Sequence, residues 1–81
     1  MSSSPLSSAF PLTMASEDST VRVVAIQGGA TLARRVADLG LNVGSELRVR
    51  QRQGEGLVVS RGETRFALGV GMAHKILVCE A

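Results

Sequence analysis

Arginine is the residue type in this sequence with the greatest chemical potential. Arg48, Arg50 and Arg52 alternate along a segment that reads as a strand, so we expect their side chains in one row on its outer face. Guanidinium groups bind carboxylates and nucleic-acid phosphates through paired hydrogen bonds. A solvated strand face carries similar alternating charge. The pattern therefore indicates an anionic ligand or simple exposure to water, and does not choose between them.

A second basic pair lies on a short predicted helix. Arg34 and Arg35 occupy its polar side and are close in sequence to the turn at 39–44. We expect these two arginines and the outer edge of Leu41 to form a partner-binding surface. The leucines and glycines of this turn equally serve to maintain the fold.

Catalytic and metal-binding constellations are missing from the sequence. His74 is the single histidine, and no Ser/His/Asp set or Cys/His pair has a telling spacing. One histidine supplies one of the three or four protein ligands that zinc usually takes, although His74 could bind a divalent metal together with a carboxylate from a second copy of the chain. Cys79 is alone, so an intrachain disulfide is excluded. We predict no enzyme, no catalytic residue, no metal site and no cofactor.

Composition restricts the architecture and the location. The chain has 81 residues, enough for one small domain. Both prolines and many serines precede Glu17, and every charged residue lies from Glu17 onward. We expect a disordered tail over 1–11 and a folded domain over 12–81. The start of the chain lacks a secretory signal pattern, and no apolar run reaches the roughly 20 residues of a membrane span, which predicts a cytoplasmic protein.

The elements that position these residues are short. Leu32, Val36 and Leu39 share one face of a helix, and Gly40 follows where a left-handed residue ends a helix. A single 3₁₀ turn is expected over Met72 to Lys75. Five strands are expected, over 21–26, 46–52, 57–61, 65–68 and 76–80.

Five strands in so short a chain favour a mainly β fold: a small five-stranded SH3-like barrel with one short inserted α-helix. The chain has no Trp or Tyr, which argues against a groove for Pro-rich peptides and against base stacking. The predicted core consists of Val23, Ile26, Leu32, Val36, Leu39, Leu41, Leu47, Val49, Leu57, Val59, Phe66, Leu68, Ala73, Ile76 and Val78.

These motifs together resemble the FeoA family. The resemblance rests on an ordered set of residues: Gly28, Gly29, Arg34, Arg35, Leu39, Gly40, Leu41, Gly44, Val58, Val59, Phe66, Leu68, Ala73, Ile76 and Val78. It covers roughly Leu12 to Glu80. The family usually has two leucines and a glycine before the first strand, where this chain has Leu12, Ala15 and Asp18.

The resemblance implies a function that composition does not reveal. FeoA proteins are small cytoplasmic accessory proteins of bacterial ferrous-iron uptake. The implied partner is FeoB, a membrane permease with a cytosolic guanine-nucleotide domain, which would recruit the chain to the inner face of the membrane. The resemblance also leaves open an arginine supplied in trans to GTP hydrolysis, by Arg34 or Arg35. The alternative is a small nucleic-acid-binding β-barrel that uses the arginine strand, which the mild net charge of +2 disfavours.

Overall fold

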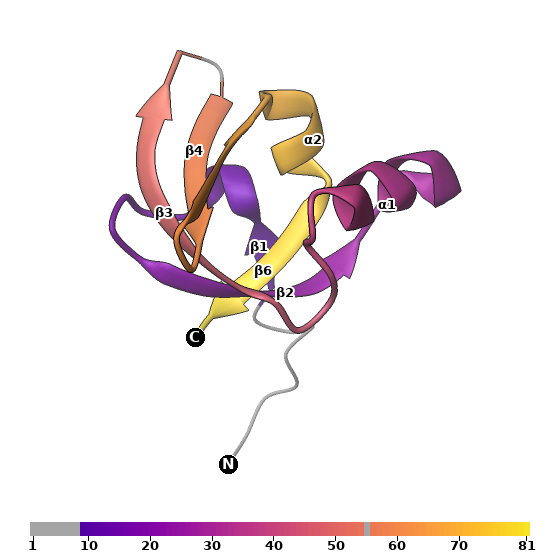
Figure 1. The fold of residues 1–81 in the computed structure, drawn as a ribbon, viewed down its shortest axis with the longest axis horizontal. Helices are drawn as coiled ribbons and strands as arrows, with labels where there is room; N and C mark the ends of the chain where they lie inside the picture. Colours follow the sequence, from indigo (N-terminus) through magenta and orange to yellow (C-terminus); the bar gives the residue numbers. More distant parts are fainter. Residues whose placement is uncertain (1–8, 55) are drawn as a thin grey trace.

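A single antiparallel sheet makes up most of the molecule (Figure 1). The computed structural model describes residues 9–54 and 56–81. Along the chain its elements are β1 (Phe10–Pro11), the 3₁₀ helix η2 (Leu12–Met14), β2 (Thr20–Ile26), α1 (Gly29–Asp38), β3 (Glu46–Gln53), β4 (Gly56–Arg61), β5 (Thr64–Leu68), α2 (Val70–His74) and β6 (Ile76–Glu80).

The five expected strands are confirmed, each within two residues of its predicted bounds. The strand order is β1-β6-β2-β3-β4-β5, so β3, β4 and β5 form the predicted meander and β6 returns to pair with β2. The end strands β1 and β5 are not paired with each other among the described residues. Instead α2 contacts η2, β4 and β6 and thereby bridges the two ends of the curved sheet.

A sixth strand, β1, was not expected. Phe10 and Pro11 pair with Val78 and Leu77 of β6. The strand therefore lies within the last two residues of the tail that we expected over 1–11, and residues 1–8 of that tail lie outside the described residues. Two residues carry too little pattern to be recognised as a strand, because the pairing with β6 is what orders them.

Helix α1 ends as predicted. Gly40 has φ 85°, and its N–H donates to the carbonyl of Ala37 at 2.8 Å. The next N–H, of Leu41, donates to the carbonyl of Val36 at 3.1 Å. This is the pair of bonds of a Schellman motif, which satisfies carbonyls at the helix end and folds the chain back onto the helix.

Helix α2 corrects the expectation of a 3₁₀ turn at Met72 to Lys75. It is an α-helix that begins two residues earlier, and the N–H of Ala73 donates to the carbonyl of Gly69 at 3.0 Å. Gly71 does not interrupt α2. Its φ is not positive, so its backbone is compatible with a right-handed helix. Only the last turn, where the N–H of Lys75 reaches Met72, has 3₁₀ spacing.

The core is close to the predicted one, with corrections that lie mostly in the N-terminal half. Leu12, Ala15 and Val21 are buried core residues that were not predicted, and Ile26, Leu32, Leu39 and Phe66 are only partly buried against the core. In β2 a bulge between Val23 and Ala25 interrupts the alternation. The inward positions are therefore Val21 and Val23, with Ile26 at the edge of the core.

Candidate functional site

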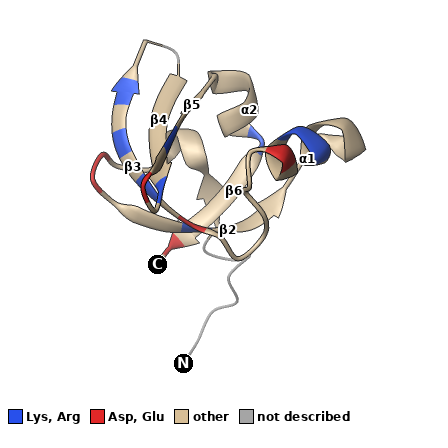
Figure 2. Cartoon of the chain, viewed as in Figure 1, with Lys and Arg blue, Asp and Glu red and all other residues tan. Residues whose placement is uncertain are grey.

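The candidate partner surface lies on α1, which sits to one side of the sheet (Figure 2). Arg34 and Arg35 are both exposed on it. Neither forms an ion pair with a carboxylate of the described residues. The one ion pair among those residues joins Arg22 and Glu46. Two unpaired guanidinium groups on one short helix are available to an acidic partner.

Leu41 does not belong to this surface. Its side chain is 0% exposed, as is that of Val36. The Schellman motif turns the chain back at Gly40 and carries Leu41 under the helix, so its expected outer edge is covered. The structure brings Arg34 and Arg35 together and assigns Leu41 to the core.

Two other residues extend the α1 surface and were missed by the sequence reasoning. Val43, in the turn after α1, is 64% exposed, which is high for an apolar side chain. A Cβ placed on Gly40 would lie 3.0 Å from Nη1 of Arg61, so the guanidinium of Arg61 lies beside the C-terminal end of α1. The position of Val43 in a turn was a signal in the sequence. Arg61, the last residue of β4, comes near α1 only through the fold, and nothing in the sequence signalled it. We use "α1 surface" for Arg34, Arg35, Val43 and Arg61.

The expected row of three arginines on β3 is wrong. Val49 pairs with Val59 but Gln51 pairs with Val58, so Arg50 is the extra residue of a β-bulge. Beyond the bulge the alternation is inverted, and Arg52 pairs with the buried Leu57.

Arg52 instead fastens the N-terminal segment to the sheet. Its Nη2 donates to the carbonyl oxygen of Ala15 at 2.6 Å, and its backbone N–H donates to Oε2 of Glu17 at 2.8 Å. The nucleic-acid alternative thus loses one of the three arginines on which it rested.

Arg22 and Glu46 face each other across β2 and β3. Their Nη2 and Oε2 atoms are 2.6 Å apart, and both side chains are about half exposed. The hydrogen bond from Arg22 to Glu46, followed by the attraction between their charges, raises the pKa of Arg22 above its ordinary value. The carboxylate of Glu46 is therefore already bound to Arg22.

The residues considered for metal binding remain apart. His74 is exposed at the end of α2, and Cys79 is half-buried on β6 with a free thiol. Within 9–54 and 56–81, no three His, Cys, Asp or Glu side chains gather closely enough to hold a metal ion. No helix in the same ranges has the length and apolar character required to span a membrane.

Comparison with known proteins adds what geometry alone does not. The model of the FeoA domain matches residues 10–79. This chain belongs to the FeoA family. It is 35% identical over 72 residues to a protein of Methanocaldococcus jannaschii named "Putative Fe(2+) transport protein A", a match that covers 89% of this chain and 88% of the relative.

FeoA structures have the same fold. A crystal structure of FeoA, described as an iron uptake regulatory protein, has a TM-score of 0.83 at 29% identity and covers 90% of this chain and 97% of that one. A manganese-dependent transcriptional repressor has a TM-score of 0.86 at 24% identity, with 98% of this chain matching 44% of the repressor. These likenesses confirm the SH3-like fold class, and the second supports the fold alone.

The entry segment of this FeoA chain departs from the family pattern in a way that the structure explains. Leu12 and Ala15 are buried at 0% and 2% exposure, so both positions keep their packing role. Asp18 stands where the family has glycine and takes φ 67°, the one positive value among described residues other than glycine. Its N–H donates to the carbonyl of Val49 at 2.7 Å, which holds the turn against β3.

Proposed function

We propose that this chain is a non-catalytic accessory protein of ferrous-iron uptake. Its membership of the FeoA family over residues 10–79 is the observation that carries the proposal. The relative from Methanocaldococcus jannaschii, named for Fe(2+) transport, supports it. A chain of this size, with no group of metal-binding side chains in the described residues, acts most simply by binding another protein.

The partner in this proposal is the FeoB permease, bound in the cytoplasm through its cytosolic guanine-nucleotide domain. The α1 surface supplies the contact. Arg34 and Arg35 form no ion pair with a described carboxylate, and Val43 adds an exposed apolar side chain in the turn that follows α1. An interface with apolar contact at its centre and arginines around it suits a partner with an acidic patch.

The test is retention of the solubilised full-length permease on the immobilised chain, at near-physiological salt, with GDP, with a non-hydrolysable GTP analogue and without nucleotide. We expect retention by the native chain and a loss of about tenfold or more for the variant R34A/R35A, because arginine is one of the residue types that most often dominate the binding energy of an interface. The variant R48A/R50A removes the same charge from β3 and is the matched control. It should retain the permease as the native chain does.

The results of this experiment test separately whether FeoB is the partner and whether the α1 surface is the contact. Failure of the native chain to retain the permease under every nucleotide condition would remove the FeoB proposal. Retention that R34A/R35A leaves unchanged would keep the partner and reject the α1 surface. GTP hydrolysis by the permease, measured in parallel, shows whether either arginine acts in trans. Such an arginine raises the rate by about 10³ to 10⁵, and R34A/R35A would abolish the gain.

A further inference from the structure

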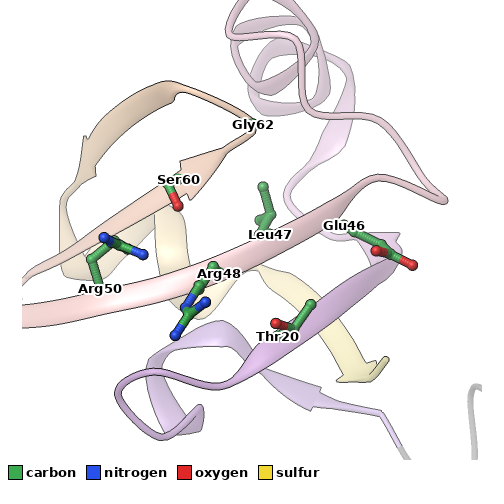
Figure 3. A pocket seen from close by; sticks show the side chains of 7 residues that line it. All are labelled: Thr20, Glu46, Leu47, Arg48, Arg50, Ser60 and Gly62. Atoms are coloured by element: carbon green, nitrogen blue, oxygen red, sulfur yellow. The ribbon is translucent and has the colours of Figure 1, made fainter.

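A hollow of about 330 Å³ lies against the sheet, over β2, β3 and β4 (Figure 3). Its lining comes from β2, from the consecutive strands β3 and β4, and from the turn after β4. The lining residues are Thr20, Glu46, Leu47, Arg48, Arg50, Ser60 and Gly62.

The strand register explains why these side chains meet. Thr20 pairs with Arg48, and Arg48 pairs with Ser60, so the three form one row across β2, β3 and β4. Residues directly opposite in antiparallel strands point to the same face. Ser60 in turn pairs with Arg65 of β5, which continues the row with another cation.

The bulge of β3 contributes the second guanidinium. Arg50 is the extra residue of the bulge and is half-buried, unlike the exposed Arg48. In Figure 3 its guanidinium lies below the hydroxyl of Ser60, while that of Arg48 lies beside Thr20. Ser60 is 8% exposed and is the one polar residue of the described chain in the buried class.

The charge of the hollow is uncompensated. Glu46 is the one carboxylate in the lining, and Arg22 already holds it at 2.6 Å. Arg48 and Arg50 form no ion pair with any carboxylate of the described residues. Arg52, which would have extended the positive charge along the strand, is turned toward Ala15. Two guanidinium groups and two hydroxyls therefore line one hollow, and among the described residues neither guanidinium group is paired with a carboxylate.

We propose that this hollow binds a phosphate-type oxyanion. Guanidinium groups form paired, charge-assisted hydrogen bonds with phosphate oxygens, and the hydroxyls of Thr20 and Ser60 supply further donors. The lining contains no aromatic side chain and only one large apolar residue, Leu47. No aromatic platform is therefore available to a base, and the group that the guanidinium and hydroxyl donors recognise is the phosphate itself, whether free or as part of a larger molecule.

The experiment is a titration of the full-length, ¹⁵N-labelled chain with sodium pyrophosphate, followed by amide chemical shifts at low and at near-physiological salt. We expect saturable shifts centred on Thr20, Arg48, Ser60 and Gly62. The variant R48Q/R50Q should weaken binding by about tenfold or more, because both charged donors are lost. R34Q/R35Q removes equal charge elsewhere and should weaken it by less than about twofold.

A milder variant separates local donors from net charge. S60A removes one hydroxyl without changing charge, and should weaken binding by about threefold to tenfold. Dispersed amide spectra establish that each variant is folded. Equal weakening by the two arginine pairs, unchanged binding in S60A or shifts scattered over the surface would each overturn the site.

Two further ligands identify what the hollow recognises. GDP should bind about as tightly as pyrophosphate, because the nucleoside finds no partner in the lining. Markedly tighter binding of GDP would overturn recognition of phosphate alone. A poly-glutamate peptide that shifts the same amides at lower concentration than pyrophosphate would also overturn it, in favour of an acidic protein segment. The site does not rest on the FeoB proposal, and R34A/R35A and R48Q/R50Q test the two independently.

Discussion

At the scale of single residues, the entry turn shows how a side chain is tolerated where the backbone favours glycine. Asp18 has φ 67°, a conformation that costs most L-residues about 1–2 kcal/mol and costs Asp less than β-branched residues. The turn is retained because the N–H of Asp18 donates to Val49, and the N–H of Val49 donates to Ser19. Local strain is thus offset by the pairing of this segment with β3.

We predict that Asp18→Gly stabilises the protein by about 0.5–1 kcal/mol, since relief of the left-handed strain exceeds the added entropy of the unfolded chain. Urea unfolding followed by far-ultraviolet circular dichroism measures the change. Ser16→Gly is the control, because Ser16 is exposed with no positive φ, and we expect it to be neutral or destabilising. A loss of stability in Asp18→Gly equal to that in the control would contradict the strain argument.

At the scale of elements, the β4 to β5 hairpin depends on a close approach of backbones. A Cβ at Gly56 would lie 2.5 Å from the carbonyl oxygen of Leu68, and neither atom belongs to a flexible side chain. Gly56 is required because a side chain has no room there. Its backbone conformation does not require glycine, since its φ is not positive. Gly71 in α2 is the opposite case, with no atom within 4 Å of an added Cβ.

We predict that Gly56→Ala destabilises the protein by about 1–3 kcal/mol, because the strands must separate to admit the methyl group. Gly71→Ala should instead stabilise it by about 0.5–1 kcal/mol, as expected for alanine in place of glycine within a helix. The urea midpoints of the two variants, compared with that of the native chain, show whether each change lowers or raises the stability. Similar midpoints for the two variants would show that the close contact at Leu68 is relieved at no cost.

At the scale of the whole molecule, the N-terminal segment is part of the domain. Leu12 is fully buried, η2 contacts α2 and β6, and Arg52 binds the carbonyl of Ala15. The boundary between tail and domain therefore falls before β1 in the described structure.

We predict that deletion of residues 1–8 changes the free energy of unfolding by less than about 0.5 kcal/mol. Deletion of residues 1–12 should cost about 2–5 kcal/mol, because it removes the pairing of β1 with β6 and the buried side chain of Leu12. That is a large part of the roughly 5–15 kcal/mol that stabilises a typical domain. Chemical denaturation of both truncations measures the difference, and a measurable loss in the shorter deletion would place the boundary earlier.

Local pattern was sufficient for much of this protein. The alternation of apolar residues located the five longer strands, and the glycine after Leu39 located the end of α1, because these features depend on neighbours a few residues apart. The order of the family's glycines, arginines and leucines was sufficient for the family, which the match over residues 10–79 confirms.

Only the tertiary structure decided which side chains face water and which meet. The Schellman motif folds Leu41 under α1, so its place in the predicted core is confirmed while the outer edge expected in the partner surface is covered. Arg52 does not continue the arginine row, because the bulge at Arg50 inverts the alternation. The hollow unites Thr20, Arg48 and Ser60 through strand register. A bulge and a register are set by hydrogen bonding between two strands, and the alternation of side chains along one strand does not determine them.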